Sequence, residues 1–537
     1  MATTPAQRRL AEALAELKAL QEAGRSVLRT EDLRRVSREA LLDQGFLQPI
    51  VPGWYMRSQP GVREGDPTPW VASAREFVQR YATHRFGDNW CVDADYSIKL
   101  HTGNNLMPSQ VIIHAPEGNN NRLDLPGKHS LFVYKTREPL PDEHIEVVRG
   151  LRAFTLPYAL TRVPEAFFRS SKQDALLALR SLPDASDLNR ILLTSGQPTA
   201  AGRLAGALRA CGRSALADDI LATLRRAGYR VEEANPFHGP IAPSGRSRPR
   251  SPYVDRIRLM WATMREGAIG TFAASNSTSP PKTKSQIDAA MRAIEEQYVI
   301  DAYHSLSIEG YRVTEQLIRR VASGEWNPDH ELGDREMRNA MAAHGYWRAH
   351  NAVKETIRRF FEGAASNVGE LVRRDHATWY REMFAPSVGA GILKPSDLAG
   401  YRNDQVYIRT ARHVPPPKEA VRDAMPGFFD LLRDEEHPAV RIVLGHFVFV
   451  FIHPYMDGNG RMARFLMNTM LCTAGYPWTV IKLDQRKRYF HTLDQASADG
   501  NIRPFAELIS ECVAASSSRP ETVRQPTAAK RRRARPS

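Results

Sequence analysis

The sequence predicts a multidomain protein whose N-terminal half is α+β, with a winged helix-turn-helix at its start, and whose C-terminal half is mainly α. Three observations support this prediction. The chain has 537 residues, which corresponds to three or four domains at roughly 100–200 residues each. Strand-like and helical segments mix before residue 236, whereas the part that follows is built around a helical core. A stretch rich in Pro, Gly, Ser and Arg separates the two halves.

The composition excludes several classes of protein. Hydrophobic residues make up 42% and charged residues 25% of the chain, so it is not disordered throughout. The longest apolar run, Ile442–Ile452, has 11 residues, whereas a membrane-spanning helix needs about 20. The first residues lack the apolar stretch of a secretory signal. We therefore expect no membrane association.

The cysteine positions indicate the redox environment. Cys91, Cys211, Cys472 and Cys512 lie far apart and form no CxxC pair. Neither a disulfide framework nor a zinc knuckle is expected from this spacing, and a reducing cytoplasm fits it best.

The net charge of +14 raises the prospect of an anionic partner. Of this charge, +6 lies between Arg519 and the C-terminus. We expect the basic tail, residues 516–537, to be disordered, either as a solvated tail or with a loose attraction to nucleic acid. The sequence leaves the oligomeric state open.

The first 60 residues show the order helix, short helix, helix and hairpin. Gln7–Ala23 has leucines at helical spacing. Thr30 can cap the next short helix, and Ser37 can cap a third one that runs to Gln44. An alternating segment through Met56 follows. This is the order of a winged helix-turn-helix and indicates DNA binding, although a small packing module can show the same order.

Residues 61–235 predict a mixed α+β domain. Gln110–His114 and Leu131–Tyr134 are strand-like, and Pro183–Tyr229 is helical in pattern.

The whole segment 1–235 resembles the AbiEi-type antitoxin proteins of bacterial toxin–antitoxin systems. The resemblance is carried by the early helix-turn-helix, the wing residues Gly53–Tyr55, the segment Ala201–Gly206 and the segment Asp218–Ile220. It implies a regulatory, DNA-binding N-terminal half. The expected phosphate or base contacts are Arg34, Arg35 and Arg38.

Two loop-like stretches follow this half. Pro236–Pro252 is rich in Pro, Gly, Ser and Arg, and Ala273–Ser285 is rich in Ser, Thr and Pro. They predict that residues 236–284 form a linker or surface arm.

The most informative segment is HPYMDGNGRMAR, from His453 to Arg464. It predicts the end of a buried helix, a glycine-rich loop and a new helix, although the periodicity of the preceding apolar stretch is also compatible with a strand. Pro454 would stop the first helix. Gly458 and Gly460 let the backbone approach a ligand closely, and the second helix directs its positive N-terminus at the same point. The result is an anion-binding nest suited to a phosphate.

The side chains of this segment supply what nucleotidyl transfer to a hydroxyl needs. Asp457 can hold Mg²⁺, which shares its coordination with phosphate oxygens. Arg461 and Arg464 lie on one helix face and can neutralise phosphates. His453 has a pKa suited to removing a proton near neutral pH.

This pattern resembles the Fic family signature, His-x-Phe-x-Asp/Glu-Gly-Asn-Gly-Arg-x-x-Arg, with Tyr455 in place of the usual Phe. The resemblance covers residues 285–515 and implies a mainly α Fic fold. It also implies transfer of AMP from ATP, with Mg²⁺, to a Ser, Thr or Tyr hydroxyl of a protein. In this reading His453 deprotonates the hydroxyl and Asn459 contacts the α-phosphate beside the glycine backbone. The two arginines stabilise the pyrophosphate.

An upstream segment resembles the inhibitory motif of Fic proteins, Ser/Thr-x-x-x-Glu-Gly/Asn. It stands at the end of a helical run, Gln286–Leu306, and its fixed positions are Ser305, Glu309 and Gly310. The resemblance implies that Glu309 pairs with Arg464 and prevents productive binding of ATP. Taken alone, a Glu before a Gly at a helix end is usually a solvated residue.

Residues 401–417 alternate in polarity and end in a run of prolines, a pattern typical of an edge hairpin. The Fic resemblance implies that this hairpin is a flap that holds a segment of the target protein as an added strand. Downstream, Leu493–Ala496 and Asp499–Asn501 resemble the closing helices of the family.

Several alternatives were weighed. The sequence contains neither the P-loop pattern of many ATPases nor the HExxH pattern of zinc proteases. His446 is interpreted as a core or surface histidine rather than a ligand. Two alternative functions stay open: other Fic chemistry, either UMP transfer or removal of AMP with Glu309 positioning water, and a mainly DNA-binding regulator that senses nucleotide.

Overall fold

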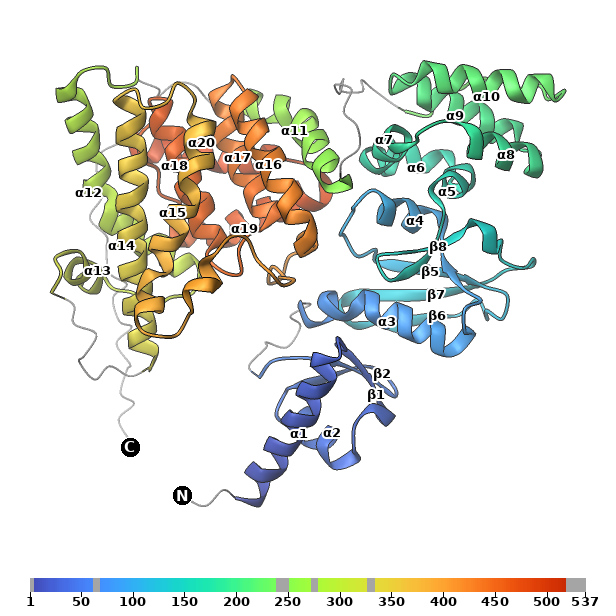
Figure 1. Cartoon of the computed structure of the whole chain (residues 1–537), viewed down its shortest axis with the longest axis horizontal. Helices are drawn as coiled ribbons and strands as arrows, with labels where there is room; N and C mark the ends of the chain where they lie inside the picture. Colours follow the sequence, from blue (N-terminus) through green and yellow to red (C-terminus); the bar gives the residue numbers. More distant parts are fainter. Residues whose placement is uncertain (1–3, 61–67, 238–250, 272–278, 326–333, 518–537) are drawn as a thin grey trace, which may run out of the picture.

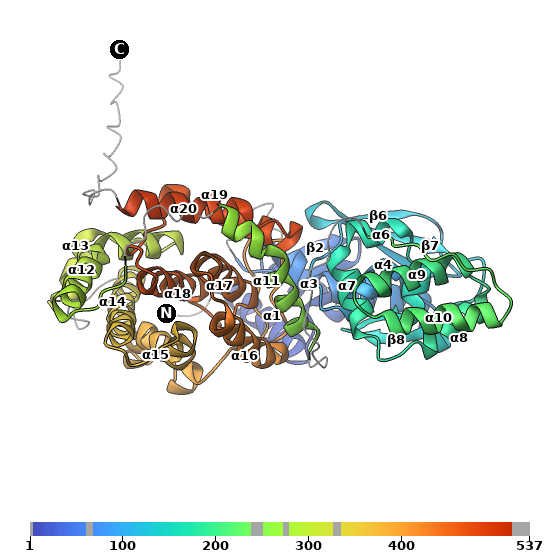
Figure 2. The same ribbon diagram turned by 90° about the horizontal axis from the view of Figure 1, so that it is seen from above.

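The structure, a computed structural model, describes residues 4–60, 68–237, 251–271, 279–325 and 334–517. Figures 1 and 2 show an N-terminal half of small sheets and short helices beside a second half of long helices. No described helix is both long and apolar enough to cross a lipid bilayer.

The chain begins with two helices and a three-stranded sheet. The elements are α1 (Pro5–Glu22), β1 (Val27–Arg29), α2 (Arg35–Asp43), β2 (Leu47–Val51) and β3 (Trp54–Arg57). The sheet is antiparallel in the order β1-β3-β2. The expected middle helix is only a single 3-10 turn at Thr30–Asp32. The third element begins before Ser37, whose side chain is buried.

Residues 68–154 form the mixed part of the first half. Its sheet has the order β4-β5-β7-β6, with β5 and β7 parallel, and the strand predictions around Gln110 and Leu131 are confirmed. The elements are α3 (Thr68–Phe86), β4 (Cys91–Val92), α4 (Ala94–His101), β5 (Gln110–Ala115), β6 (Arg122–Leu125), β7 (His129–Lys135), β8 (Ile145–Val148) and β9 (Leu151–Phe154).

A group of short helices completes the first half, above the sheet in the view of Figure 1. Their shared core contains the buried face of each helix. They are α5 (Leu156–Arg162), α6 (Glu165–Ser170), α7 (Lys172–Ser181), α8 (Ser186–Ser195), α9 (Pro198–Ala210) and α10 (Ser214–Arg226).

The linker prediction for residues 236–284 is wrong in its middle. Residues 252–271 form helix α11 (Pro252–Thr271), whose buried side chains Ile257, Trp261 and Met264 join the core of the second half. Their spacing gives one apolar helix face. The flanking stretches rich in Pro and Ser concealed this pattern, and much of those stretches, residues 238–250 and 272–278, lies outside the described part of the chain.

The second half is a bundle around α17, which is buried along almost its whole length. Helices α11, α16 and α18 pack against it, and the expectation of a buried helix before His453 is confirmed. The helices of this half are α12 (Lys284–Ile308), α13 (Glu315–Ala322), α14 (Asp334–Phe361), α15 (Val368–Gly389), α16 (Lys418–Asp434), α17 (Pro438–Ile452), α18 (Asn459–Thr473), α19 (Arg486–Asp499) and α20 (Arg503–Ser517).

The flap prediction is wrong in its secondary structure. Residues 401–417 form irregular turns and extended pieces, with no strand among them. The three terminal prolines have no N–H to donate to a ladder, and Thr410 has a positive φ of 63°, which interrupts an extended path. Part of this segment instead touches α3: the backbone N–H of Thr410 donates to the Thr68 hydroxyl at 3.3 Å.

A buried ion pair connects the two halves. Arg256 of α11 reaches Asp174 of α7 and donates to the backbone carbonyl of Thr102 at 3.1 Å. The same carboxylate accepts bonds from the Thr102 hydroxyl at 3.0 Å and the Asn104 amide at 2.9 Å. Since Arg256 and Asp174 are both buried, separation of the halves would break the ion pair and leave Asp174 with only the neutral donors Thr102 and Asn104.

We predict that Asp174→Ala lowers the free energy of unfolding by about 3–5 kcal/mol, because it leaves a buried guanidinium unpaired. Chemical denaturation, together with proteolysis at the junction of the halves, measures the effect. The matched control is Asp187→Ala, whose ion pair with Arg190 is exposed and is worth at most about 1 kcal/mol. Equal stability of the two variants would contradict the prediction.

Candidate active site

His453 lies at the junction between α17 and the glycine-rich loop. It caps α17 in the left-handed conformation, with φ 53° and ψ 62°, which a non-glycine residue adopts only where its surroundings enforce it. Its Nδ1 lies 3.2 Å from the carbonyl oxygen of Val450. Since a carbonyl can only accept, Nδ1 carries the proton and Nε2 keeps a lone pair. Burial lowers the pKa of His453 to about 4, so the ring is neutral at physiological pH.

The loop after His453 is closed by Asn459. The Asn459 side chain accepts from the Tyr455 N–H at 2.9 Å and donates to the Tyr455 carbonyl at 2.8 Å. The ring of Tyr455 stacks on Tyr380 at 3.7 Å between centroids and is buried, as expected of an anchor residue. The Asn459 amide therefore shapes the loop, which differs from the expected contact with a phosphate.

Two glycines form the floor of the predicted anion nest. Gly458 precedes α18 with φ 80°, a conformation that glycine adopts without strain. Gly460 lies in the first turn of α18, and a Cβ atom there would be only 2.3 Å from an oxygen of Glu309. A carboxylate thus already occupies the space above the N-terminus of α18, where an anion is favoured.

The two arginines of α18 are buried, each with 2% exposure. Arg461 lies between the rings of Tyr311 and Phe384, at 5.3 and 5.2 Å from their centroids. Within the described part of the chain, the Nε of Arg461 has no hydrogen-bond partner, and neither has one terminal nitrogen of Arg464. Buried donors of this kind are rare, so a ligand with acceptor oxygens fits this site.

The inhibitory segment predicted around Ser305 reaches Arg464. The Arg464 Nε donates to the Ser305 hydroxyl at 2.8 Å, and a terminal nitrogen donates to Glu309 Oε1 at 2.7 Å. Glu309 follows the last residue of α12, and Gly310 ends the helix with φ 91°. The expected pair of Glu309 and Arg464 is therefore present in the structure.

Asp457 is the expected metal carboxylate. It is exposed, and its two oxygens accept from the Gly458 N–H at 2.6 Å and from Arg461 at 3.3 Å. The described residues contain no cluster of three or more His, Cys, Asp or Glu side chains able to hold a metal. One exposed carboxylate beside an anion nest fits Mg²⁺ brought by phosphates, because Mg²⁺ needs only one or two protein carboxylates.

Sequence reasoning missed the role of Arg402. This residue is buried, and its side chain donates to the His453 carbonyl at 2.9 Å, to the Asp404 carbonyl at 3.0 Å and to the Pro416 carbonyl. Its backbone N–H donates to the Pro454 carbonyl at 2.9 Å. Arg402 thus fastens the segment 401–417 to the loop. No motif marks it, since its partners are backbone carbonyls.

Two further histidines are structural. His446 is fully buried, and its Nε2 lies 2.8 Å from the Tyr489 hydroxyl, in agreement with its interpretation as a core residue. His413 is buried against the ring of Phe451 and contacts the Phe451 carbonyl at 2.9 Å.

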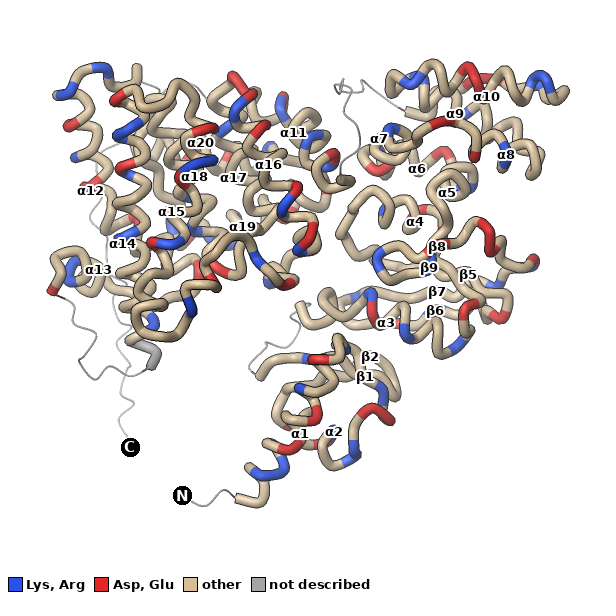
Figure 3. Tube along the Cα trace, in the orientation of Figure 1, with Lys and Arg blue, Asp and Glu red and all other residues tan. Residues whose placement is uncertain are grey.

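The three arginines expected to contact DNA already have partners within the first domain. The Nε of Arg34 lies 3.4 Å from Glu16, and that of Arg35 lies 2.8 Å from Glu39. Arg38 donates to the Thr30 carbonyl at 2.9 Å. Figure 3 shows basic and acidic positions interspersed in both halves. The role of these arginines in DNA binding stays a prediction.

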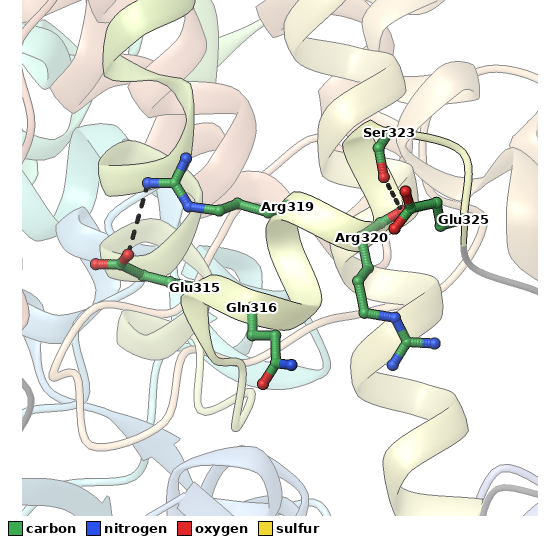
Figure 4. Close-up of a pocket in the computed structure, with 6 residues that line it drawn as sticks. All are labelled: Glu315, Gln316, Arg319, Arg320, Ser323 and Glu325. Atoms are coloured by element: carbon green, nitrogen blue, oxygen red, sulfur yellow. Dashed lines mark hydrogen bonds and ion pairs between the residues drawn. The ribbon is translucent and has the colours of Figure 1, made fainter.

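A hollow of about 450 Å³ lies along α13. Figure 4 shows that its polar groups pair on the same helix: Arg319 with Glu315 at 3.6 Å, and the Ser323 hydroxyl with the Arg320 carbonyl at 3.1 Å. We assign this hollow no chemistry.

Comparison with known proteins identifies the second half of the chain. Residues 370–471 match the sequence model of the Fic/DOC family. The protein named Protein adenylyltransferase Fic from Drosophila virilis is 31% identical over 265 residues, which are 48% of this chain and 48% of the relative. The protein of the same name from Drosophila willistoni is 29% identical over 48% of this chain and 46% of its own length.

The chain therefore spans about half the length of the curated relatives it matches. A solved structure of Fic-1 from C. elegans has 18% sequence identity and a TM-score of 0.35, and the match covers 67% of this chain and 89% of that one. The segment that matches the Fic/DOC family model, residues 370–471, includes the His453 loop.

We predict that His453 titrates near pH 4, because burial opposes the charged ring and Arg402 repels it. Its folded pKa lies below that of an unfolded histidine, so protonation favours unfolding. The contribution to stability is therefore lost as the pH falls from about 6.5 towards 4. NMR titration of the ring protons, assigned by comparison with His453→Gln, measures the midpoint. A midpoint above about pH 6 would contradict the burial argument.

Proposed function

We propose that this protein is an adenylyltransferase that transfers AMP from ATP to a Ser, Thr or Tyr hydroxyl of a target protein. The observation that carries the proposal is the pair of buried, unpartnered donors on Arg461 and Arg464 beside the N-terminus of α18. They stand next to a histidine whose Nε2 is free to accept a proton. Relatives named protein adenylyltransferases over the same part of the chain support the assignment.

In the proposed reaction the target hydroxyl gives its proton to Nε2 of His453. The hydroxyl oxygen then forms a bond to the α-phosphorus, and the bond between that phosphorus and the bridging oxygen to the β-phosphate breaks. Pyrophosphate leaves with the electron pair, while Arg461 and Arg464 stabilise its negative charge. Backbone N–H groups at Gly458 and Gly460 hold the α-phosphate.

Mg²⁺, held by Asp457 and the nucleotide phosphates, would neutralise negative charge on the pyrophosphate. Asp457 has the exposure that this role requires, since its side chain is 65% exposed.

Autoinhibition by Glu309 is part of the proposal. The Glu309 carboxylate contacts Arg464 at 2.7 Å and lies against Gly460, so it uses the same arginine and nest that the phosphates need. Ser305 accepts two further hydrogen bonds from the Arg464 guanidinium, through its hydroxyl at 2.8 Å and its carbonyl at 3.1 Å. Glu309 must move away before a nucleotide can bind in a productive geometry.

We also propose that the first 60 residues bind DNA and that the target protein docks near residues 401–417. The order of helices and strands in residues 5–57 supports the first proposal. The second is supported by the attachment of this segment to the catalytic loop through Arg402. The first half of the chain touches the same segment. In this proposal the first half binds DNA, controls docking of the target protein at residues 401–417, or does both.

Removal of AMP is the second candidate activity. The observation that favours it is the position of Glu309 beside Gly460, where a carboxylate can orient water toward a phosphorus atom. Mass spectrometry of a modified target separates these reactions from UMP transfer, because AMP and UMP add different masses.

We predict that His453→Ala lowers the transfer rate by about 10²–10⁴-fold, the usual contribution of a general base. ATP binding should stay near its original affinity, since the nest and the arginines hold the phosphates. Labelling with radioactive ATP measures transfer, and calorimetry measures binding. The control is His491→Ala, because His491 is exposed on α19. His446→Ala is unsuitable, since it would leave a cavity in the core. A variant that keeps more than about a tenth of the rate would refute the assignment.

We predict that Glu309→Gly raises automodification about 100-fold, because an inhibited state favoured by about 3 kcal/mol leaves under ~1% of molecules competent. Automodification with labelled ATP measures this. Glu315→Gly, which removes a carboxylate from the neighbouring α13, should leave labelling unchanged. Equal labelling of the original chain and Glu309→Gly, with Arg464→Ala inactive in both backgrounds, would refute the inhibitory role alone.

We predict that DNA retention in a gel-shift assay is lost when residues 1–60 are deleted. Replacing Arg34, Arg35 and Arg38 by Gln should reduce the salt slope by about 1–3, at roughly 0.9 per phosphate contact. The control removes three exposed arginines elsewhere: Arg122, Arg190 and Arg230. Unchanged retention after the deletion would move the DNA-binding role to the basic tail.

A further inference from the structure

A pocket of about 340 Å³ lies where the two halves meet. One wall is α3 of the first half, and the opposite wall belongs to residues 405–417 of the second. Tyr253 of α11 contributes as well. The Tyr407 hydroxyl donates to the Ala72 carbonyl of α3 at 3.4 Å. The volume is within the usual range for small-molecule sites, and no residue of the loop 453–464 lines this pocket.

Two arginines line the pocket without a carboxylate partner. Arg149 donates to the Asn104 carbonyl at 3.1 Å and to the side chain of Asn105, both neutral groups. In the described part of the chain, Arg75 makes neither a hydrogen bond nor an ion pair. Burial, together with the neighbouring charge of Arg75, lowers the pKa of Arg149 to about 10. Two cations that share a partly dehydrated space favour a bound anion.

The nearest acidic groups do not neutralise this pair. Glu76, next to Arg75 in α3, acts on Tyr407, but its carboxylate accepts hydrogen bonds from the N–H groups of Ser26 and Val27. Asp404 acts on the hydroxyl group of Tyr407 and Glu419 on that of Tyr253. Among the described residues, the groups that act on Arg149 include no carboxylate. The pocket therefore keeps a net positive charge.

The remaining walls are apolar or aromatic. Val414 and Pro415 face the pocket from the second half, and Val71 and Met107 face it from the first. Such walls suit an apolar or aromatic body, whereas the arginines suit an oxyanion, which guanidinium groups bind with two parallel hydrogen bonds.

We propose that this pocket binds a small organic anion, whose phosphate or carboxylate faces Arg75 and Arg149 and whose apolar body packs against Val414 and Pro415. Its walls come from both halves of the chain, so a bound ligand fastens residues 405–417 to α3. If the proposed transfer reaction is correct, the ligand thereby controls the segment on which the target docks. The binding site itself does not depend on that reaction.

Calorimetric titration of the full chain tests the proposal with three probes: phenyl phosphate, benzoate and the uncharged benzyl alcohol. We expect at least one of the two acids to bind and the alcohol not to bind. The acid that binds more tightly identifies the phosphate or the carboxylate class. Hydrogen exchange in residues 405–417 should slow when that acid is present.

Variants locate the site. Arg75→Gln should weaken binding at least tenfold, whereas Arg75→Lys should keep part of it. Since Arg75 makes no bond that supports the fold, thermal unfolding should be the same for both variants. Arg461→Gln, in the loop near His453, should leave binding unchanged, although it should impair transfer. The inference is overturned if neither acid binds at millimolar concentration, if binding survives Arg75→Gln, or if Arg461→Gln abolishes it. Loss of transfer alone bears only on the proposed function.

Discussion

The burial of two positive charges on α18 constrains the whole second half. Arg461 and Arg464 carry guanidinium groups into a helical core, and an uncompensated charge there is costly. Part of the compensation comes from rings, since Tyr311 and Phe384 enclose Arg461. The rest comes from α12, which must end close enough for Ser305 and Glu309 to reach Arg464. The position of α12, and with it the access to the nest, follows from this requirement.

The same constraint explains how the proposed inhibitory contact of Glu309 with Arg464 can also stabilise the fold. A carboxylate next to Arg464 lowers the cost of burying the charge. A phosphate in the same place would do so equally well. The empty protein and the nucleotide-bound protein can therefore satisfy the same buried donors with different anions, and exchange between them leaves the core unchanged.

Much of the candidate site could be predicted from the sequence, because the segment 453–464 fixes both the identity and the spacing of its residues. A helix end, a left-handed glycine and a second helix suffice to bring His453, Asp457 and Arg461 together. The pairing of Glu309 with Arg464 was also predicted, although from a family resemblance. The direction of the Asn459 side chain could not be predicted, because an amide can form hydrogen bonds with the backbone and with a phosphate equally well. Arg402 was missed for a related reason: its partners are carbonyl groups, which every residue has.

The errors in the fold have physical causes as well. In α11 the apolar face was concealed by Pro- and Ser-rich neighbours, so composition averaged over the stretch suggested a linker. In residues 401–417 the alternation of side chains was real, but prolines and the positive φ of Thr410 prevent a paired ladder. The middle helix of the first domain is reduced to one 3-10 turn, since only residues 30–34 lie between β1 and α2.

The place of α11 decides where this chain can be divided. The family match begins at residue 370, and the sequence motifs alone indicate a domain boundary at residue 285. Yet α11 contributes Ile257, Trp261 and Met264 to the core between α16, α17 and α20. Arg256, on the same helix, is buried in the first half. A fragment that starts at residue 285 would expose an apolar furrow along its bundle, and one that starts at residue 251 would leave Arg256 without Asp174 and Thr102, its partners in the first half. The smallest unit able to fold with all its surfaces satisfied therefore extends across both halves, because α11 contributes side chains to each of them.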